Sequence, residues 1–333
     1  MVNPPLKHGG NLNQAAAQYH IPLKNWLDLS TGINPNGYTV PTIPAALWQR
    51  LPEADDGLNE AAQAYYNAPH VLATAGSQAA IQALPRLRSA SNVAMPRTIY
   101  AEHAHHWLAH GHKLHYFDGE PDASLLERID VLLVCNPNNP TGRLFQPETL
   151  LVWHQQLAQK GGWLVVDEAF MDCTPKLSLS QFAHLPNLIV LRSLGKFFGL
   201  AGARVGFVLA KKSFLTNLEN LLGPWPIASP ARFITKLALQ DTAWQQATRV
   251  NLVQQSAQLS VLLSKYHLAQ QGANALFHWL PSDQAQLIHT RLAQQGVWTR
   301  LFEEWNALRF GLPPEQGWMR LEAALKQINV NDL

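Results

Sequence analysis

The segment LRSLGKFFGLAGARVG, residues 191–206, carries the strongest indication of fold and function in this chain. An apolar run, residues 188–191, leads into it and has the composition of a buried β-strand. Lys196 follows Ser193 by three residues, and Arg204 comes eight residues after Lys196. A lysine amine can form a Schiff base with a carbonyl compound, and a guanidinium group binds phosphate. Taken alone, a lysine is more often a solvated surface residue, so the wider pattern has to decide.

Short apolar runs alternate with helical patterns on both sides of this segment. The runs cover residues 71–75, 92–95, 113–117, 131–135, 163–166, 188–191 and 205–210. This alternation predicts an α/β fold. Because the runs are continuously apolar, we expect a mainly parallel sheet that is covered by helices on both faces. Ligands bind at the carboxyl ends of the strands in such sheets, so the polar residues just after each run are candidate site residues.

Two of these runs end in residues that suit a heterocyclic ligand. The turn NPNNPTG, residues 136–142, presents Asn139, whose amide can donate a hydrogen bond to a ligand oxygen. Asp167 ends the next run and can pair with a ring nitrogen and keep it protonated. For the NPNNPTG segment, the alternative is a tight turn that binds no ligand. A Mg²⁺-binding carboxylate of a nucleotide hydrolase is the alternative for Asp167, but the chain lacks the G-x-x-x-x-G-K-[ST] loop of that class.

A third run ends in AGSQ, residues 75–78, and leads directly into a helical pattern. The N-terminus of a helix offers free backbone N–H groups and the positive end of the helix dipole. Gly76, Ser77 and Gln78 are therefore candidate phosphate ligands. Serine is also a common N-cap residue, and that alternative stays open.

In this order, NPNNPTG, VVDEAF and SLGKFFGLAGARVG resemble the motifs of fold-type I pyridoxal-phosphate (PLP) enzymes of the class I/II aminotransferase family. The resemblance covers about residues 28–310 and implies PLP as the cofactor. It implies that Lys196 binds PLP covalently and that Asp167 pairs with the pyridine nitrogen. The other cofactor contacts that it implies are Asn139 at the ring hydroxyl, and Ser193, Arg204, Gly76, Ser77 and Gln78 at the phosphate.

Further segments resemble one branch of this family, the threonine-phosphate decarboxylases of cobalamin biosynthesis, which are close to histidinol-phosphate aminotransferases. The segments are HGGN (8–11), DLSTGINP (28–35), LPEADDGL (51–58) and YAEH (100–103). The resemblance implies that L-threonine O-3-phosphate is decarboxylated to (R)-1-amino-2-propanol O-2-phosphate, with His8, Asn34 and Arg309 as substrate-binding residues. Histidinol-phosphate transamination is the alternative function. A PLP-binding module without turnover is disfavoured, because a complete set of lysine, aspartate and arginine has little use there.

Several positions depart from the family pattern or leave roles open. Phe170 stands where many aminotransferases have a tyrosine, and Leu51 stands where relatives offer a tyrosine to the partner subunit's cofactor. The resemblance implies that His103 is the aromatic residue that stacks on the ring, with Tyr100 as the alternative. Arg309 is expected to bind either the carboxylate or the phosphate of the substrate.

The same pattern predicts how the chain divides into domains. We expect an N-terminal segment (1–40) that joins the small domain, a large PLP-binding domain (41–235) and a small C-terminal α+β domain (236–333). Residues 230–266 are helical in pattern, and strand, helix, strand and helix are expected at 275–280, 282–295, 308–311 and 314–328.

Composition excludes several other classes of protein. The net charge is only +2 and no run of Lys and Arg is dense enough for nucleic acid. No apolar run approaches the roughly 20 residues that span a bilayer, and no signal peptide is recognisable, so we expect a cytoplasmic protein. Only two cysteines occur, Cys135 and Cys173, and both are expected to serve packing. No metal site is expected, and the expected partners are an amino acid phosphate and a second copy of the chain in a homodimer.

Overall fold

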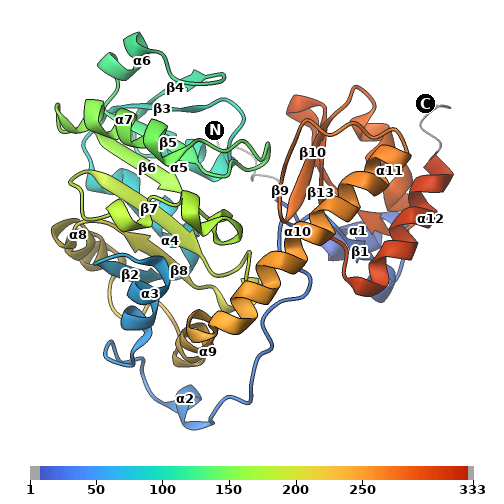
Figure 1. The fold of residues 1–333 in the computed structure, drawn as a ribbon, viewed down its shortest axis with the longest axis horizontal. Coiled ribbons are helices and arrows are strands. Elements are labelled where there is room, and N and C mark those ends of the chain that lie inside the picture. The colour runs from blue at the N-terminus through green and yellow to red at the C-terminus, as the bar shows by residue number, and fades with distance from the viewer. Residues whose placement is uncertain (1–7, 329–333) are drawn as a thin grey trace. The chain divides into compact units, whose positions relative to one another are not determined.

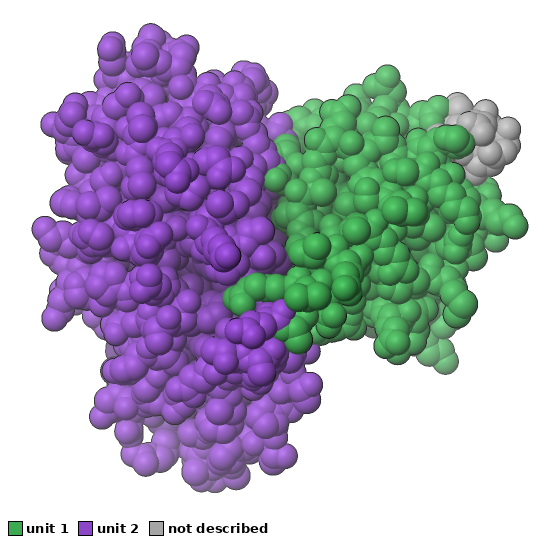
Figure 2. All heavy atoms as spheres, viewed as in Figure 1, with its two compact units in different colours: residues 1–36, 140–142, 247–333 green, residues 37–139, 143–246 purple. Residues whose placement is uncertain are grey.

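The computed structural model describes residues 8–328 and resolves them into two compact units, which Figure 2 shows in different colours. Unit 1 comprises residues 8–36, 140–142 and 247–328, and unit 2 comprises residues 37–139 and 143–246. The predicted domain boundaries near residues 40 and 235 remain predictions, because compactness alone does not test independent folding.

Unit 2 is built on a seven-stranded sheet with the order β2-β8-β7-β6-β5-β3-β4 (Figure 1). The strands are β2 (Val71–Thr74), β3 (Asn92–Pro96), β4 (Lys113–Phe117), β5 (Val131–Cys135), β6 (Trp163–Asp167), β7 (Leu188–Ser193) and β8 (Gly206–Leu209). All neighbouring strands are parallel except β8, which is antiparallel to both β2 and β7. Every residue of β5, β6 and β7 is buried, as expected for strands that are covered on both faces.

The helices of unit 2 begin and end at recognisable residues. They are α2 (Ala46–Gln49), α3 (Leu58–Tyr66), α4 (Gly76–Ala83), α5 (Ala101–Ala109), α6 (Ala123–Arg128), α7 (Pro147–Ala158), α8 (Lys212–Leu222) and α9 (Ser229–Gln240). The Asp122 side chain caps α6 by accepting from the Leu125 N–H, and α7 starts at a proline. Short 3₁₀ helices occupy Leu84–Leu87, Met171–Cys173, Pro175–Leu177, Ser180–Phe182 and Ala201–Ala203.

Unit 1 contains a four-stranded antiparallel sheet with the order β12-β13-β10-β9. Its strands are β9 (Gly272–Asn274), β10 (Phe277–Pro281), β12 (Arg300–Phe302) and β13 (Ala307–Gly311). A separate parallel pair joins β1 (Leu27–Asp28) to β11 (Val297–Trp298). The helices are α1 (Leu12–Tyr19), α11 (Ala285–Gln294) and α12 (Trp318–Ile328), with 3₁₀ turns at Leu23–Asn25, Glu303–Trp305 and Glu315–Gly317.

The long helix α10 (Thr242–Lys265) begins in unit 2 and runs mostly through unit 1. It is separated from α9 by Asp241 alone, so the helical region that the sequence predicts is two helices. Across residues 8–328, no helix is both long enough and apolar enough to span a bilayer.

Candidate active site

The register of the sheet brings the predicted site residues of unit 2 to one end of the strands. Cys135 is the partner of Asp167 across β5 and β6, and Ser193 is the partner of Gly206 across β7 and β8. Gly206 is in turn the partner of Thr74 on β2, two residues before α4 starts. The polar strand ends predicted from the sequence are therefore neighbours in space.

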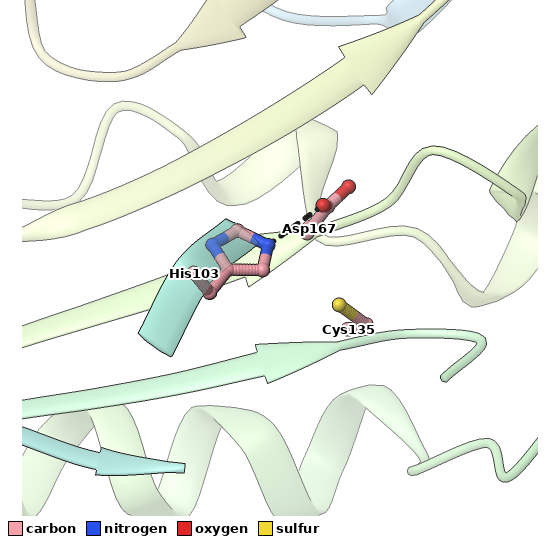
Figure 3. Close-up of side chains that lie close together, drawn as sticks. All are labelled: His103, Cys135 and Asp167. Carbon is pink, nitrogen blue, oxygen red and sulfur yellow. Dashed lines mark hydrogen bonds and ion pairs between the residues drawn. The ribbon is translucent and has the colours of Figure 1, made fainter. Parts of the chain in front are cut away.

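Asp167 is buried and held in a fixed orientation (Figure 3). Its Oδ1 accepts from the backbone N–H of Ala169 (3.0 Å), and its Oδ2 lies 2.9 Å from Nε2 of His103. His103 comes from α5 and is only 1% exposed, and its Nδ1 has no hydrogen-bond partner within residues 8–328. A carboxylate held in this way is suited to pair with a protonated ring nitrogen.

Cys135 completes a group of three donor side chains with His103 and Asp167, whose ligand atoms lie within 4.8 Å of one another. Burial, with Asp167 beside it, raises the pKa of Cys135 well above its usual value. The side chain is therefore a neutral thiol at pH 7, so the Asp167 carboxylate has no second anion beside it there.

The start of α4 has the features of an anion site. Its N-cap residue, Ala75, provides no side-chain cap, so the first N–H groups of the helix lack that partner. Gly76 has φ +70°, and a Cβ there would lie 2.8 Å from Nη2 of Arg204, so the guanidinium group lies directly over the first turn. Arg204 is exposed, and its Nη1 donates to the Ala201 carbonyl (3.3 Å). A phosphate group fits this cradle of backbone N–H groups and a guanidinium.

Close packing of β8 against α4 fixes the cradle in place. A Cβ at Gly206 would lie 2.3 Å from the backbone nitrogen of Ser77, so only glycine allows this approach. Because Gly206 is also the register partner of Ser193, two of the predicted phosphate ligands, Ser77 and Ser193, lie beside the same glycine.

Lys196 lies in the loop after β7 and is partly buried. Its Nζ is 5.4 Å from the centre of the Phe170 ring. The two residues that follow it, Phe197 and Phe198, are fully buried and pack edge to face, with ring centres 5.1 Å apart. This anchoring holds Lys196, a partly buried residue, at the strand end.

Asn139 is the one asparagine of the NPNNPTG turn that is not fully buried. Asn136 closes the turn through both ends of its amide, which bond the backbone of Phe145 (3.1 and 2.7 Å). Asn138 donates to the Thr98 carbonyl (2.8 Å). Two of the asparagines thus stabilise the turn, which leaves Asn139 as the candidate ligand predicted from the sequence.

The predicted substrate residues all belong to unit 1. Arg309 on β13 is buried, donates to the Ser30 carbonyl (2.8 Å) and lies 5.0 Å from the Phe277 ring. Asn34 is also buried, and its Oδ1 accepts from the Asn36 N–H (2.9 Å). His8 is exposed, and its carbonyl accepts from Arg300 (3.1 Å).

Sequence reasoning missed Arg300, which lies directly opposite Arg309 in the register of β12 and β13. Like charges opposite each other destabilise a sheet, so the pair is a candidate site for an anionic ligand. Both guanidinium groups lie near the Phe302 ring, at 4.9 and 6.0 Å. The only sequence signal is that Arg300 opens a short apolar stretch just before β13.

A buried ion cluster that the sequence analysis also missed lies next to the site residues in the chain. Arg192 precedes Ser193, and its Nη1 donates to Glu168 (2.6 Å), the residue after Asp167. Its Nη2 donates to Asp172. Burial alone would lower the pKa of Arg192, but Asp172 and Glu168 outweigh this effect and raise it above the usual value. The cluster ties the ends of β6 and β7 together.

Comparison with known proteins places this arrangement in a family. The family model described as "Aminotransferase class I and II" matches residues 48–333. The chain belongs to the class I and II aminotransferase family. A threonine-phosphate decarboxylase from Pseudomonas aeruginosa is 50% identical over 96% of this chain and 97% of its own length. A second threonine-phosphate decarboxylase, from a Sinorhizobium species, is 38% identical over 99% of this chain and 100% of its own length.

A solved aminotransferase structure has the same fold. The histidinol-phosphate aminotransferase from Sinorhizobium meliloti, in complex with pyridoxal-5'-phosphate, superimposes with a TM-score of 0.83. The superposition covers 98% of this chain and 96% of that chain, at 19% identity. The family membership and the fold predicted from the sequence are confirmed.

Proposed function

We propose that this chain decarboxylates L-threonine O-3-phosphate to (R)-1-amino-2-propanol O-2-phosphate with pyridoxal 5'-phosphate, a step of cobalamin biosynthesis. The observation that carries the cofactor chemistry is the buried Asp167–His103 pair, which lies at the same end of the sheet as the uncapped start of α4. The near full-length decarboxylases at 50% and 38% identity support the substrate and the reaction type.

We assign the cofactor contacts to residues of unit 2. Lys196 holds PLP covalently, Asp167 keeps its pyridine nitrogen protonated, and Asn139 bonds the ring hydroxyl. The phosphate is bound by Ser193, Arg204 and the backbone N–H groups at the start of α4. When bound, the protonated ring provides an electron sink for the electron pair left at Cα. Tyr100 is the better candidate for the aromatic residue that stacks on the cofactor ring, because the His103 side chain is hydrogen-bonded to Asp167.

The residues of unit 1 bind the substrate anion in this proposal. Arg309 and Arg300, with His8 and Asn34, hold the phosphate of the substrate, so the molecule is oriented by its far end. The α-carboxylate can then stand perpendicular to the cofactor ring, which selects the bond that breaks. The bond between Cα and the carboxylate would break, CO₂ would leave, and Cα would receive one proton. We assign this proton to the ammonium form of Lys196, after the substrate amine has displaced its side chain from the cofactor.

The test is to incubate the purified protein with PLP and threonine phosphate, without a keto acid, and to measure CO₂ and aminopropanol phosphate. Both products are expected from the wild type and neither from Lys196→Ala. If product forms only with 2-oxoglutarate, and histidinol phosphate is the better amine donor, the enzyme is a transaminase and the proposal is wrong.

A homodimer is a second part of the proposal. Large apolar side chains are exposed around residues 40–51 and the 223–227 loop of unit 2, among them Trp48 (67% exposed), Leu51 (64%) and Trp225 (57%). Surfaces of this kind commonly mark protein interfaces. Light scattering should give twice the chain mass of 37.1 kDa, and Trp48→Ser with Leu51→Asp should reduce it. A monomeric wild type would contradict the dimer.

The predicted cytoplasmic location also remains part of the proposal.

A further inference from the structure

The side chain of Gln78 joins α4 to α5. Gln78 is the third residue of α4, and its Nε2 donates to Oε2 of Glu102 (2.5 Å) in the first turn of α5. Its Oε1 accepts from the hydroxyl of Tyr100 (3.3 Å), the residue just before α5. Both ends of the amide are thus engaged by one neighbouring element. The backbone N–H of Gln78, and not its side chain, is left to bind phosphate.

Glu102 is held where it can orient Gln78. The residue is buried at 9% exposure, and its Oε2 also lies 2.9 Å from Nε2 of His106, one turn further along α5. A carboxylate in the first turn of a helix is stabilised by the helix dipole. A carboxylate makes a stronger hydrogen bond than a neutral acceptor, so this contact holds the Gln78 amide in one orientation.

Tyr100 connects this contact to the centre of the site. Its ring packs edge to face against His103, with centres 6.0 Å apart and planes at 85°, and His103 in turn holds Asp167. Burial, together with Glu102 and Asp167, raises the pKa of Tyr100, so its hydroxyl stays a donor at neutral pH. The ring is therefore fixed by His103 on one side and by Gln78 at its hydroxyl.

We propose that Glu102 is a positioning residue: it orients Gln78, and Gln78 holds the Tyr100 ring where that ring contacts the cofactor. The inference rests on the proposed PLP site and deepens it, because Glu102 and the side chain of Gln78 bond each other and are not among the proposed cofactor ligands. It predicts that Glu102 variants bind PLP more weakly because the Tyr100 ring is no longer held in place.

The experiment compares Glu102→Ala with its matched control, Glu102→Gln, which keeps an oxygen acceptor for Gln78. The dissociation constant for PLP is measured by fluorescence titration of the apo-protein. Glu102→Ala should weaken PLP binding about three- to tenfold, the effect of one lost hydrogen bond, and Glu102→Gln should restore most of it. In apo-protein labelled with 3-fluorotyrosine, the ¹⁹F resonance of Tyr100, assigned through Tyr100→Phe, should shift in Glu102→Ala and not in Glu102→Gln.

A double-mutant cycle decides whether the effect passes through the Tyr100 hydroxyl. Tyr100→Phe should weaken PLP binding as much as Glu102→Ala, and the double variant should be no worse than either. Additive losses, equal losses in both Glu102 variants, or an unshifted ¹⁹F resonance would overturn the proposal. A wild type that binds no PLP would refute the proposed function instead, while the apo ¹⁹F spectra still test the contact between Glu102 and Tyr100.

Discussion

Replacing Gly206 with alanine tests how strictly β8 positions the start of α4. A Cβ at this position would lie 2.3 Å from the Ser77 nitrogen, 2.6 Å from the Gly76 carbonyl carbon and 2.9 Å from the Arg192 carbonyl oxygen. Ordinary contact begins near 3.4 Å, so the backbone of Ser77 must move by about 1.1 Å, which is 3.4 minus 2.3 Å. All three atoms belong to the backbone, so no side-chain rotation can relieve the clash.

Overpacking of this kind should lower the free energy of unfolding by about 1–3 kcal/mol, measured by urea denaturation. The displaced N–H groups of α4 should also lose hydrogen bonds to the cofactor phosphate. One such bond to a charged group contributes about 1.5–3 kcal/mol, so PLP affinity should fall about ten- to a hundredfold. Gly202→Ala is the matched control, because nothing lies within 4 Å of a Cβ there. If both variants bind PLP equally well, β8 does not position the cradle.

Four further predictions follow from the site and from unit 1. Lys196→Ala should abolish the link to PLP that borohydride traps, and a reduced adduct on another lysine would refute the assignment. Asp167→Ala should lower turnover by orders of magnitude while PLP affinity falls less, so near-normal turnover would contradict its role. Arg309→Ala should lower kcat/KM for threonine phosphate by about one to two orders of magnitude, and an unchanged value would remove it from the substrate site. Burial lowers the pKa of His278 and of His289 to about 4, so the unfolded chain binds more protons between about pH 6.5 and 4. The free energy of unfolding should therefore decrease as the pH is lowered from about 6.5 to 4, by up to about 3 kcal/mol per histidine. His278→Gln should reduce this dependence of the unfolding free energy on pH, measured by denaturation at several pH values.

The strands of unit 2 could be predicted from the sequence because their pattern is local. Continuous runs such as residues 131–135 and 163–166 are buried on both faces and contain the β-rich apolar residues that this environment selects. Asn139, Asp167 and Lys196 could be selected as candidates for the same reason, since each lies within five residues after such a run.

Contacts between residues far apart in the chain could not be predicted. His103 meets Asp167 across 64 positions, and Arg300 faces Arg309 only because of the register between two short strands. The strand β1 has two residues and exists because it pairs with β11, far along the chain. The helix α1 was not predicted, although Leu12, Ala15, Ala16 and Tyr19 recur at helical spacing and pack together in one cluster.

The division of candidate residues between the two units has a consequence for protein engineering. Lys196, Asp167 and the other proposed cofactor ligands are in unit 2, whereas Arg300 and Arg309 lie on adjacent strands of unit 1. A mutant library confined to β12 and β13 would vary anion recognition without altering any proposed cofactor ligand. Selection from such a library would search for new phosphorylated or carboxylated amines while the reactivity of the bound cofactor is retained.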